Sequence, residues 1–195
     1  GVHCAVLSAI LRARLACFSE RTAAAMDKVT AELRQRLAVE KDPNVRQDLE
    51  ILIRSVDSDL EGTRLRRKYF LSWIDAPRTM FGGIKGLLDD QVLPARRQKA
   101  VELLRRYVGD YPGTTPLTDL ARARFAETRA PGLLGPDKVA LDNALTNAGT
   151  YAEGIRKLFA KYRITGAEAA LARLDKQIAD YTAWERTEVL PLARA

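Results

Sequence analysis

Residues that could support acid–base, metal or nucleophilic chemistry are scarce in this 195-residue sequence. It holds one histidine, His3, and two cysteines, Cys4 and Cys17. Zinc-assisted hydrolysis and nucleophilic triads draw on imidazole or thiolate groups at fixed spacing, and the sequence has no His-x-x-His and no Cys-x-x-Cys. We therefore predict no catalytic, metal or cofactor-binding residue in the chain. Residue types alone leave open whether the protein to which it belongs is an enzyme.

Two other groups resemble functional motifs but have simpler structural explanations. Asp89 and Asp90 are adjacent, so on a helix their side chains point about 100° apart and cannot share a proton or a metal. Residues 81–86 (FGGIKG) have the glycines of a phosphate loop, but no predicted strand precedes them and no Ser or Thr follows Lys85. We interpret these glycines as positions of close helix packing or bending. Cys17, beside Phe18, is most simply a small buried hydrophobic residue.

Aromatic residues are the remaining candidates for a binding groove. A groove could be lined by Trp73, Trp184, Tyr107, Tyr111 and Tyr181, although such residues more often belong to a core with one wet edge.

The charge distribution argues against a nucleic-acid-binding protein. The net charge is +7 and the isoelectric point about 9.6. Basic and acidic residues number 13 and 10 in residues 1–68, 10 and 7 in 69–134, and 9 and 8 in 135–195, whereas nucleic-acid binders gather their positive charge into a patch or arm. The densest basic cluster, Arg64 to Lys68, is explained by a solvated helix end, where cations are favoured by the helix dipole.

Helical periodicity runs through the whole sequence and predicts an all-α fold of about eight helices in an irregular bundle or array, with no sheet. Apolar stripes lie at 26–37, 45–60, 101–108, 117–125, 141–162 and 171–181. Predicted starts are Asp42-Pro43, Asp75-Ala76-Pro77, Leu93-Pro94, Thr115-Pro116 and the capping box Thr165-x-x-Glu168. Pro191 is predicted to stop the last helix.

Two segments are predicted along the chain. Residues 1–19 form an amphipathic helical segment at a boundary of the polypeptide, because Arg12 and Arg14 interrupt what would be the hydrophobic region of a signal peptide. Residues 20–195 form a single helical domain. No run of about 18 apolar residues occurs, so we predict no membrane span.

Several stretches, taken in order, resemble one known family. They are residues 75–83 (DAPRTMFGG), 94–97 (PARR) with 104–107 (LRRY), 113–117 (GTTPL), 132–136 (GLLGP) and 184–191 (WERTEVLP). Together they are similar to the N-terminal helical part of the bacterial domain-of-unknown-function 885 family. Its members are labelled lipoproteins or secreted proteins and are distantly similar to helical zinc metallopeptidases.

The resemblance implies a function that periodicity does not supply. It implies a non-catalytic N-terminal domain that forms one wall of a substrate cleft for peptides and docks against a zinc-bearing C-terminal half. The zinc helix of the family has no counterpart here, so zinc is expected only in a longer protein. Arg78, Tyr107 and Trp184 are the candidate cleft-lining residues. A periplasmic or secreted location, or a lipoprotein, is also implied.

This leading hypothesis predicts a large exposed apolar face where the missing half, or a homo-oligomer partner, would sit. The alternative is an autonomous helical adaptor that binds a partner helix or an acidic surface. A further alternative, nucleic-acid binding through Arg64–Lys68 and Arg96–Lys99, predicts an affinity that falls steeply with salt.

Overall fold

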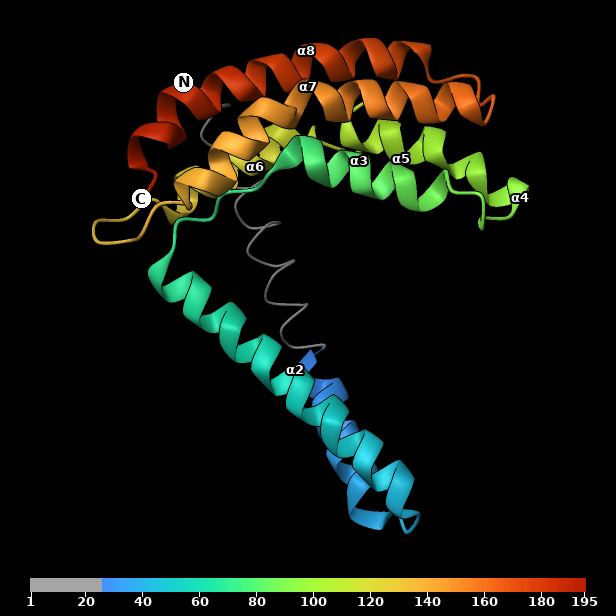
Figure 1. The fold of residues 1–195 in the computed structure, drawn as a ribbon, viewed down its shortest axis with the longest axis vertical. Coiled ribbons are helices and arrows are strands. Elements are labelled where there is room, and N and C mark those ends of the chain that lie inside the picture. Colours follow the sequence, from blue (N-terminus) through green and yellow to red (C-terminus); the bar gives the residue numbers. More distant parts are fainter. Residues whose placement is uncertain (1–25) are drawn as a thin grey trace. The chain divides into compact units, whose positions relative to one another are not determined.

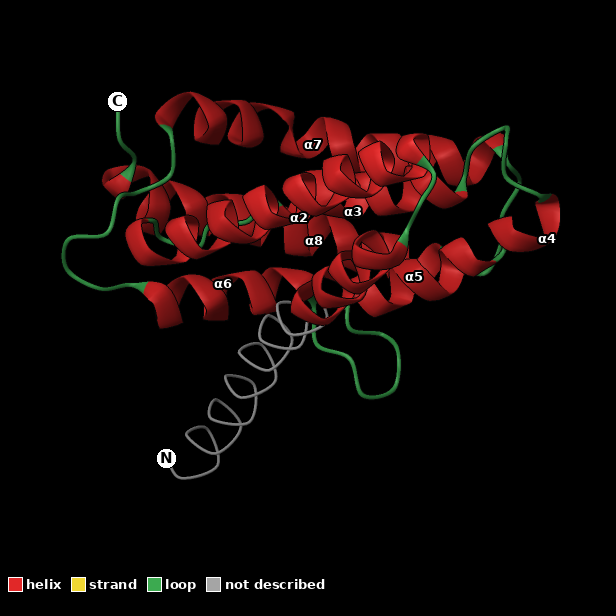
Figure 2. Cartoon of the chain, turned by 90° about the horizontal axis from the view of Figure 1, so that it is seen from below, coloured by secondary structure: helices red, strands yellow, loops and turns green. Residues whose placement is uncertain are grey.

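The computed structural model describes residues 26–195, so His3, Cys4, Cys17 and the predicted segment 1–19 lie outside the described part. The predicted all-α class is confirmed: the described residues are helical, with an isolated bridge between Asp137 and Arg194 and no strand (Figures 1 and 2). Seven α-helices, α2 to α8, follow a helical stretch over residues 26–39. The helix number is therefore close to the eight expected.

The chain divides into two compact units between Phe70 and Leu71. We call residues 26–70 the hairpin and Leu71–Ala195 the bundle. The division falls inside 20–195, the segment that we expected to form one domain. Periodicity could not reveal it, because an apolar stripe shows that a helix has a buried face but not which other helices share its core.

The hairpin consists of the helix over residues 26–39 and α2 (Pro43–Tyr69), which run antiparallel. The predicted start of α2 is confirmed: the Asp42 carboxylate accepts hydrogen bonds from the backbone N–H groups of Asn44 and Val45, and Pro43 occupies the first turn. A side chain at this position stabilises the helix because the first N–H groups have no partner within it.

The bundle contains six α-helices: α3 (Ala76–Leu87), α4 (Pro94–Arg97), α5 (Lys99–Tyr107), α6 (Leu117–Thr128), α7 (Lys138–Lys161) and α8 (Glu168–Trp184). Its main core is formed by α3, α5, α7 and α8. The side chains at its centre are fully buried, at 0% exposure, and are Met80, Ile84, Leu104, Ile155 and Leu174. The bundle therefore closes its own apolar faces.

Two predicted helix starts in the bundle are wrong in detail. α6 begins at Leu117 and α8 at Glu168, and neither receives a side-chain capping hydrogen bond. The Glu168 carboxylate instead accepts a hydrogen bond from the Gly166 N–H at 3.2 Å. Gly166 has φ +84°, a left-handed turn that moves the N-cap from Thr165 to Ala167, two residues later, so the Thr165 capping box does not form.

The end of α8 also differs from expectation. After Trp184 the chain continues as a π-helix over Glu185–Val189 and a 3-10 turn over Leu190–Leu192. Pro191 lies in that turn and has no N–H for an α-helical ladder. The α-helix therefore ends at Trp184, seven residues before Pro191, and the helical segment ends at Leu192, just after it. Glu185 and Val189 of the π-helix are buried.

The glycine-containing α3 shows the close packing that was predicted. A Cβ atom on Gly83 would lie 2.2 Å from the Tyr107 hydroxyl oxygen. Glycine is therefore the residue that lets the end of α5 approach α3.

Candidate functional site

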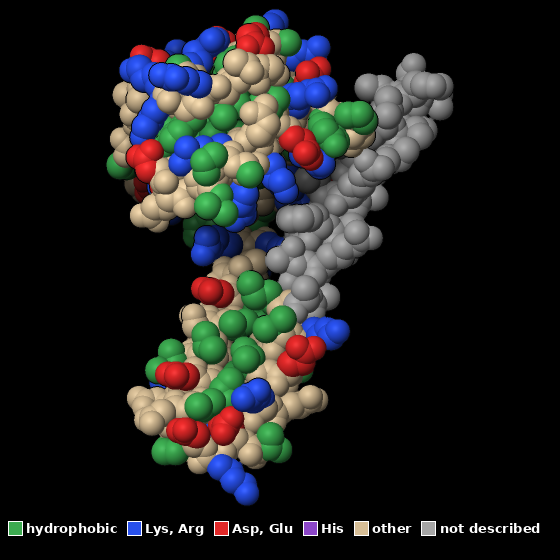
Figure 3. Space-filling model, turned by 90° about the vertical axis from the view of Figure 1, so that its right-hand side faces the viewer, with side chains coloured by type: hydrophobic (Ala, Val, Ile, Leu, Met, Phe, Trp, Pro, Cys, Tyr) green, Lys and Arg blue, Asp and Glu red, His purple; other side chains and the backbone are tan. Residues whose placement is uncertain are grey.

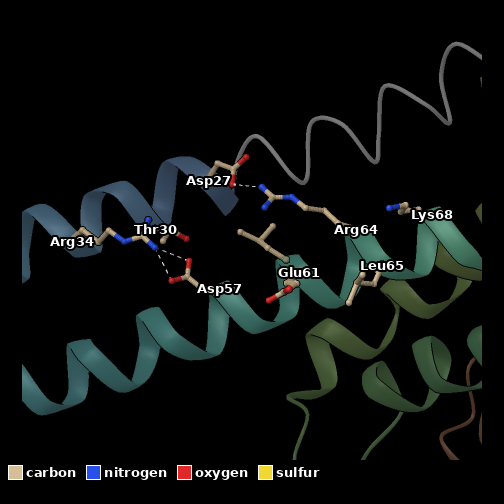
Figure 4. A pocket seen from close by; sticks show the side chains of 9 residues that line it. Asp27, Thr30, Arg34, Asp57, Glu61, Arg64, Leu65 and Lys68 are labelled. Atoms are coloured by element: carbon tan, nitrogen blue, oxygen red, sulfur yellow. Dashed lines mark hydrogen bonds and ion pairs between the residues drawn. The ribbon is translucent and has the colours of Figure 1, made fainter.

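The hairpin holds a groove of about 540 Å³ between residues 26–39 and α2 (Figure 4). Two ion pairs link the helices across it: Arg34 donates to both carboxylate oxygens of Asp57 at 2.9 and 2.6 Å, and Arg64 lies 3.6 Å from Asp27. Glu61, Leu65 and Lys68 also line the groove. Because the carboxylates of Asp27 and Asp57 are held by arginines, they are unsuited to act as a free base or a metal ligand. The groove ties the two helices together.

The side of α2 turned away from residues 26–39 is uncharged and carries exposed apolar side chains toward its two ends. At its border, Leu65 also lines the groove. We call this side the α2 outer face and define it by positions three or four apart along the helix: Ile51, Ser55, Ser58, Gly62, Leu65 and Tyr69. None of these residues is charged. Ile51, Leu65 and Tyr69 are 55%, 48% and 46% exposed.

The two sides of α2 are clearly distinguished by burial. The side that packs on residues 26–39 carries Leu49, which is 7% exposed, together with the half-buried Ile53, Val56 and Leu60. At 3.6 residues per turn these residues lie about half a turn from the α2 outer face. α2 therefore carries apolar side chains on two opposite sides, and residues 26–39 cover one of them; the other side has Ser55, Ser58 and Gly62 between its apolar ends.

Exposed apolar side chains are concentrated in the hairpin. Large hydrophobic residues that are at least 39% exposed there are Met26, Val29, Val39, Ile51, Leu52, Leu65 and Tyr69. In the bundle the exposed ones are Leu93, Leu134 and Val139, which belong to three separate segments. Figure 3 shows hydrophobic side chains along one face of the hairpin, with charged side chains beside and between them.

The three predicted cleft-lining residues lie in different surroundings. Arg78 is exposed in the first turn of α3. Tyr107 packs against the main core, and burial raises the pKa of its hydroxyl. Trp184 packs against a second, smaller core cluster formed by Leu71, Phe125, Leu141 and Val189. Its ring centroid lies 5.4 Å from that of Phe125 and 5.1 Å from that of Tyr181. Tyr107 and Trp184 thus belong to different clusters, and that these residues line a cleft stays a prediction.

Sequence reasoning missed Glu185, the one carboxylate of the described residues that is buried. Its side chain is 1% exposed, and the Trp73 indole N–H donates to Oε1 at 2.8 Å. Oε2 is buried without a hydrogen-bond partner. The signal was present in the sequence, because Glu185 follows Leu174, Ile178 and Tyr181 at helical spacing along the apolar stripe.

The surroundings of Glu185 disfavour its ionised form. Burial raises its pKa to about 7, and the nearby Asp75 carboxylate adds to the effect, while the Trp73 hydrogen bond and the Arg122 guanidinium oppose it. Burial also raises the pKa of the neighbouring Tyr181, whose hydroxyl donates to the Ile74 carbonyl at 2.7 Å. Because solvent does not reach this cluster, we assign it a structural role.

A second groove, of about 560 Å³, lies between α7 and α8. Its lining is mostly small and apolar: Ala148, Gly149, Ala152, Ala179 and Ala183. The Arg156–Asp175 ion pair lies at this groove. Arg186 also lines the groove.

Neither metal ligands nor membrane spans emerge in the described part. Within residues 26–195, no three His, Cys, Asp or Glu side chains come together in a group that could hold a metal ion. None of the helices described there is both long and apolar enough to cross a bilayer. No family model, curated protein or solved structure matches the chain.

Proposed function

We propose that this chain is a non-catalytic helical interaction domain that docks to a protein partner through the α2 outer face. The bundle is the scaffold in this proposal, and the hairpin presents the docking surface. The observation that carries it is the exposed, uncharged face formed by Ile51, Ser55, Ser58, Gly62, Leu65 and Tyr69. Exposed large apolar side chains gathered on one element are typical of interaction sites.

The contrast between the two units supports the proposal. Of the described hairpin residues, Thr30 and Leu49 alone are buried, and two helices that bury so little gain little stability from packing. The bundle, in contrast, has a closed core and needs no additional element. The hairpin is therefore the part of the chain that gains most from a partner.

The charges next to the α2 outer face favour a protein partner over a nucleic acid. The basic turn at Arg64–Lys68 directly follows an acidic turn that holds Asp57, Asp59 and Glu61. Arg64 is also paired with Asp27. A phosphate backbone would be repelled by the acidic turn, whereas a protein can offer both signs of charge.

A second candidate is the N-terminal domain of a metallopeptidase-like protein, in which the partner would be a zinc-bearing half. The exposed apolar face that this hypothesis predicts has a counterpart in the α2 outer face. The resemblance to the domain-of-unknown-function 885 family is its other support, and a periplasmic or lipoprotein location would accompany it. In this case the hairpin, rather than the bundle, would dock to the zinc-bearing half.

Photo-cross-linking in the native cells tests the proposed function. A photoreactive residue at Leu65 is expected to give a covalent adduct, because Leu65 would contact the partner. The matched control is Val139, which is 69% exposed and lies on α7, away from the hairpin sequence. The mass of the adduct identifies the partner: a zinc-bearing polypeptide, another protein or a second copy. Equal background yields at the two positions would contradict the proposal.

A further inference from the structure

We propose that the partner on the α2 outer face is a second copy of this chain, with the two α2 helices paired parallel and in register. This inference rests on the proposed function, since it names the occupant of the same surface.

The spacing of the α2 outer face suits the pairing of two helices. Its six positions alternate between steps of four and three, the pattern through which two helices at a shallow crossing angle contact each other. Ile51, Leu65 and Tyr69 supply apolar contacts toward the two ends. In the middle, Ser55, Ser58 and Gly62 are small, and a Cβ atom on Gly62 would meet nothing within 4 Å. Two backbones can therefore approach closely there.

The edges of the face carry charges of opposite sign. One edge holds Arg54, Glu61 and Lys68, and the other holds Asp59 and Arg66. All five residues are exposed, and none forms an ion pair within the described part of the chain. Their charges are therefore available to a partner.

Parallel, in-register pairing places four of these five charges opposite a charge of the other sign and leaves Lys68 without one. In this geometry an edge residue lies opposite the residue five positions later on the other edge of the partner helix, and these pairs set orientation and partner choice. Arg54 then meets Asp59 of the second copy, and Glu61 meets Arg66 of the second copy. The two-fold symmetry of a homodimer repeats both pairs.

Antiparallel pairing is disfavoured by the same charges. Centred on residue 60, it would place Ile51 opposite Tyr69 and Ser55 opposite Leu65, so the apolar contacts would be kept. However, it would bring Asp59 beside Asp59 of the second copy and Glu61 beside Glu61 of the second copy, and it would bring Arg54 near Lys68. Like charges across an interface weaken association. The charge pattern thus selects the parallel arrangement.

Charge reversal along single edges tests the inference. One variant carries Arg54→Glu and Glu61→Lys, and the other carries Asp59→Lys and Arg66→Glu. In each homodimer every edge pair becomes repulsive, so we expect the dissociation constant measured by sedimentation equilibrium to rise by at least about tenfold over that of the native chain. In an equimolar mixture every edge pair is attractive again, so a heterodimer of native affinity is expected. Circular dichroism checks that both variants keep their helical content.

Disulfide formation tests the orientation. In a chain with Cys4→Ser and Cys17→Ser, Ser55→Cys is expected to cross-link two copies on mild oxidation, because the parallel register places the two Ser55 positions face to face. In the antiparallel pairing they would be separated by about 15 Å along the helix. Thr63→Cys, exposed on α2 but off the outer face, is the matched control and should not cross-link.

The outcomes separate this inference from the proposed function. A native chain that stays monomeric at high micromolar concentration would overturn the second copy as partner, while an adduct of another protein at Leu65 would still support the proposed function. A native dimer that is insensitive to both charge reversals would overturn the parallel register. Absence of both dimer and adduct would overturn the inference and the proposed function together.

Discussion

The variant Glu185→Gln is expected to stabilise the bundle at pH 8 by about 3 kcal/mol and to leave it nearly unchanged at pH 4. Glutamine has the shape of the protonated acid and can accept the same hydrogen bond from Trp73. It therefore reproduces the neutral form of Glu185 at every pH. At pH 8 the native protein must bury a charged carboxylate, which lowers its free energy of unfolding. The variant carries no such charge, so its free energy of unfolding is higher by that amount.

The direction of the pH dependence follows from the raised pKa. Glu185 loses its proton near pH 7 in the folded protein and near its ordinary value of 4.5 in the unfolded chain. Between these values the folded state holds more protons, so its stability falls as the pH rises. The contribution of Glu185 is thus complete below about pH 4.5 and is lost by about pH 7.

Urea unfolding between pH 4 and pH 8, followed by the fluorescence of Trp73 and Trp184, measures this effect. Both tryptophans belong to the bundle, so the signal reports the unit that contains Glu185. Glu188→Gln is the matched control, since Glu188 lies in the same π-helix but is exposed, with an ion pair to Arg129 at 3.4 Å. A difference between Glu185→Gln and the native chain that stays constant across this pH range would show that Glu185 is not buried as a neutral acid.

Removing the Trp184 side chain is expected to lower the free energy of unfolding of the bundle by about 3 kcal/mol. The indole contacts Phe125 edge-on and lies beside Tyr181, and the Arg122 guanidinium carbon is 5.6 Å from its ring centroid. Trp184→Ala would leave a cavity among these groups. The change should leave the hairpin and its association unaffected.

Arg78→Ala is the natural comparison, because Arg78 was predicted together with Trp184 but its side chain is exposed. Its replacement should change the stability by less than about 0.5 kcal/mol. Denaturant unfolding of the two variants, followed by circular dichroism at 222 nm, measures both values. A loss well below 1 kcal/mol for Trp184→Ala would contradict the packing role assigned to Trp184.

The fold class and several helix boundaries could be predicted from the sequence because they depend on local chemistry. Asp42 with Pro43, and Asp75 with Ala76 and Pro77, satisfy the first turns of α2 and α3 within a few residues of chain. The capping box at Thr165 was wrong because a neighbouring glycine adopts a left-handed turn. A capping motif shows that a helix could start at that residue, but it does not show whether the backbone at the next residue has helical dihedral angles.

The division into hairpin and bundle, and the candidate site, depend on contacts between distant residues. The stripe from Val45 to Leu60 was visible in the sequence, yet the free side of α2 emerged only once residues 26–39 were seen to cover the opposite side. Glu185 was missed for a related reason. It continues an apolar stripe, but in a sequence a charged residue at such a position indicates that the stripe has ended, and only the structure shows that the residue is buried. The regular spacing of uncharged residues along the α2 outer face, in contrast, is visible in the sequence itself.

The central claim, that the α2 outer face is covered in the working protein, is tested most directly by the reactivity of single cysteines in the native cells. In the chain with Cys4→Ser and Cys17→Ser, the rate of maleimide modification is compared between Ser55→Cys, on the face, and Thr63→Cys, off it. Each rate in cells is divided by the modification rate of the same variant measured on the purified protein, diluted until it is monomeric. A covered face predicts at least about tenfold slower modification of Ser55→Cys in cells, with Thr63→Cys unchanged. Equal rates in cells and in dilute solution at both positions would show that the face stays open and would contradict the account.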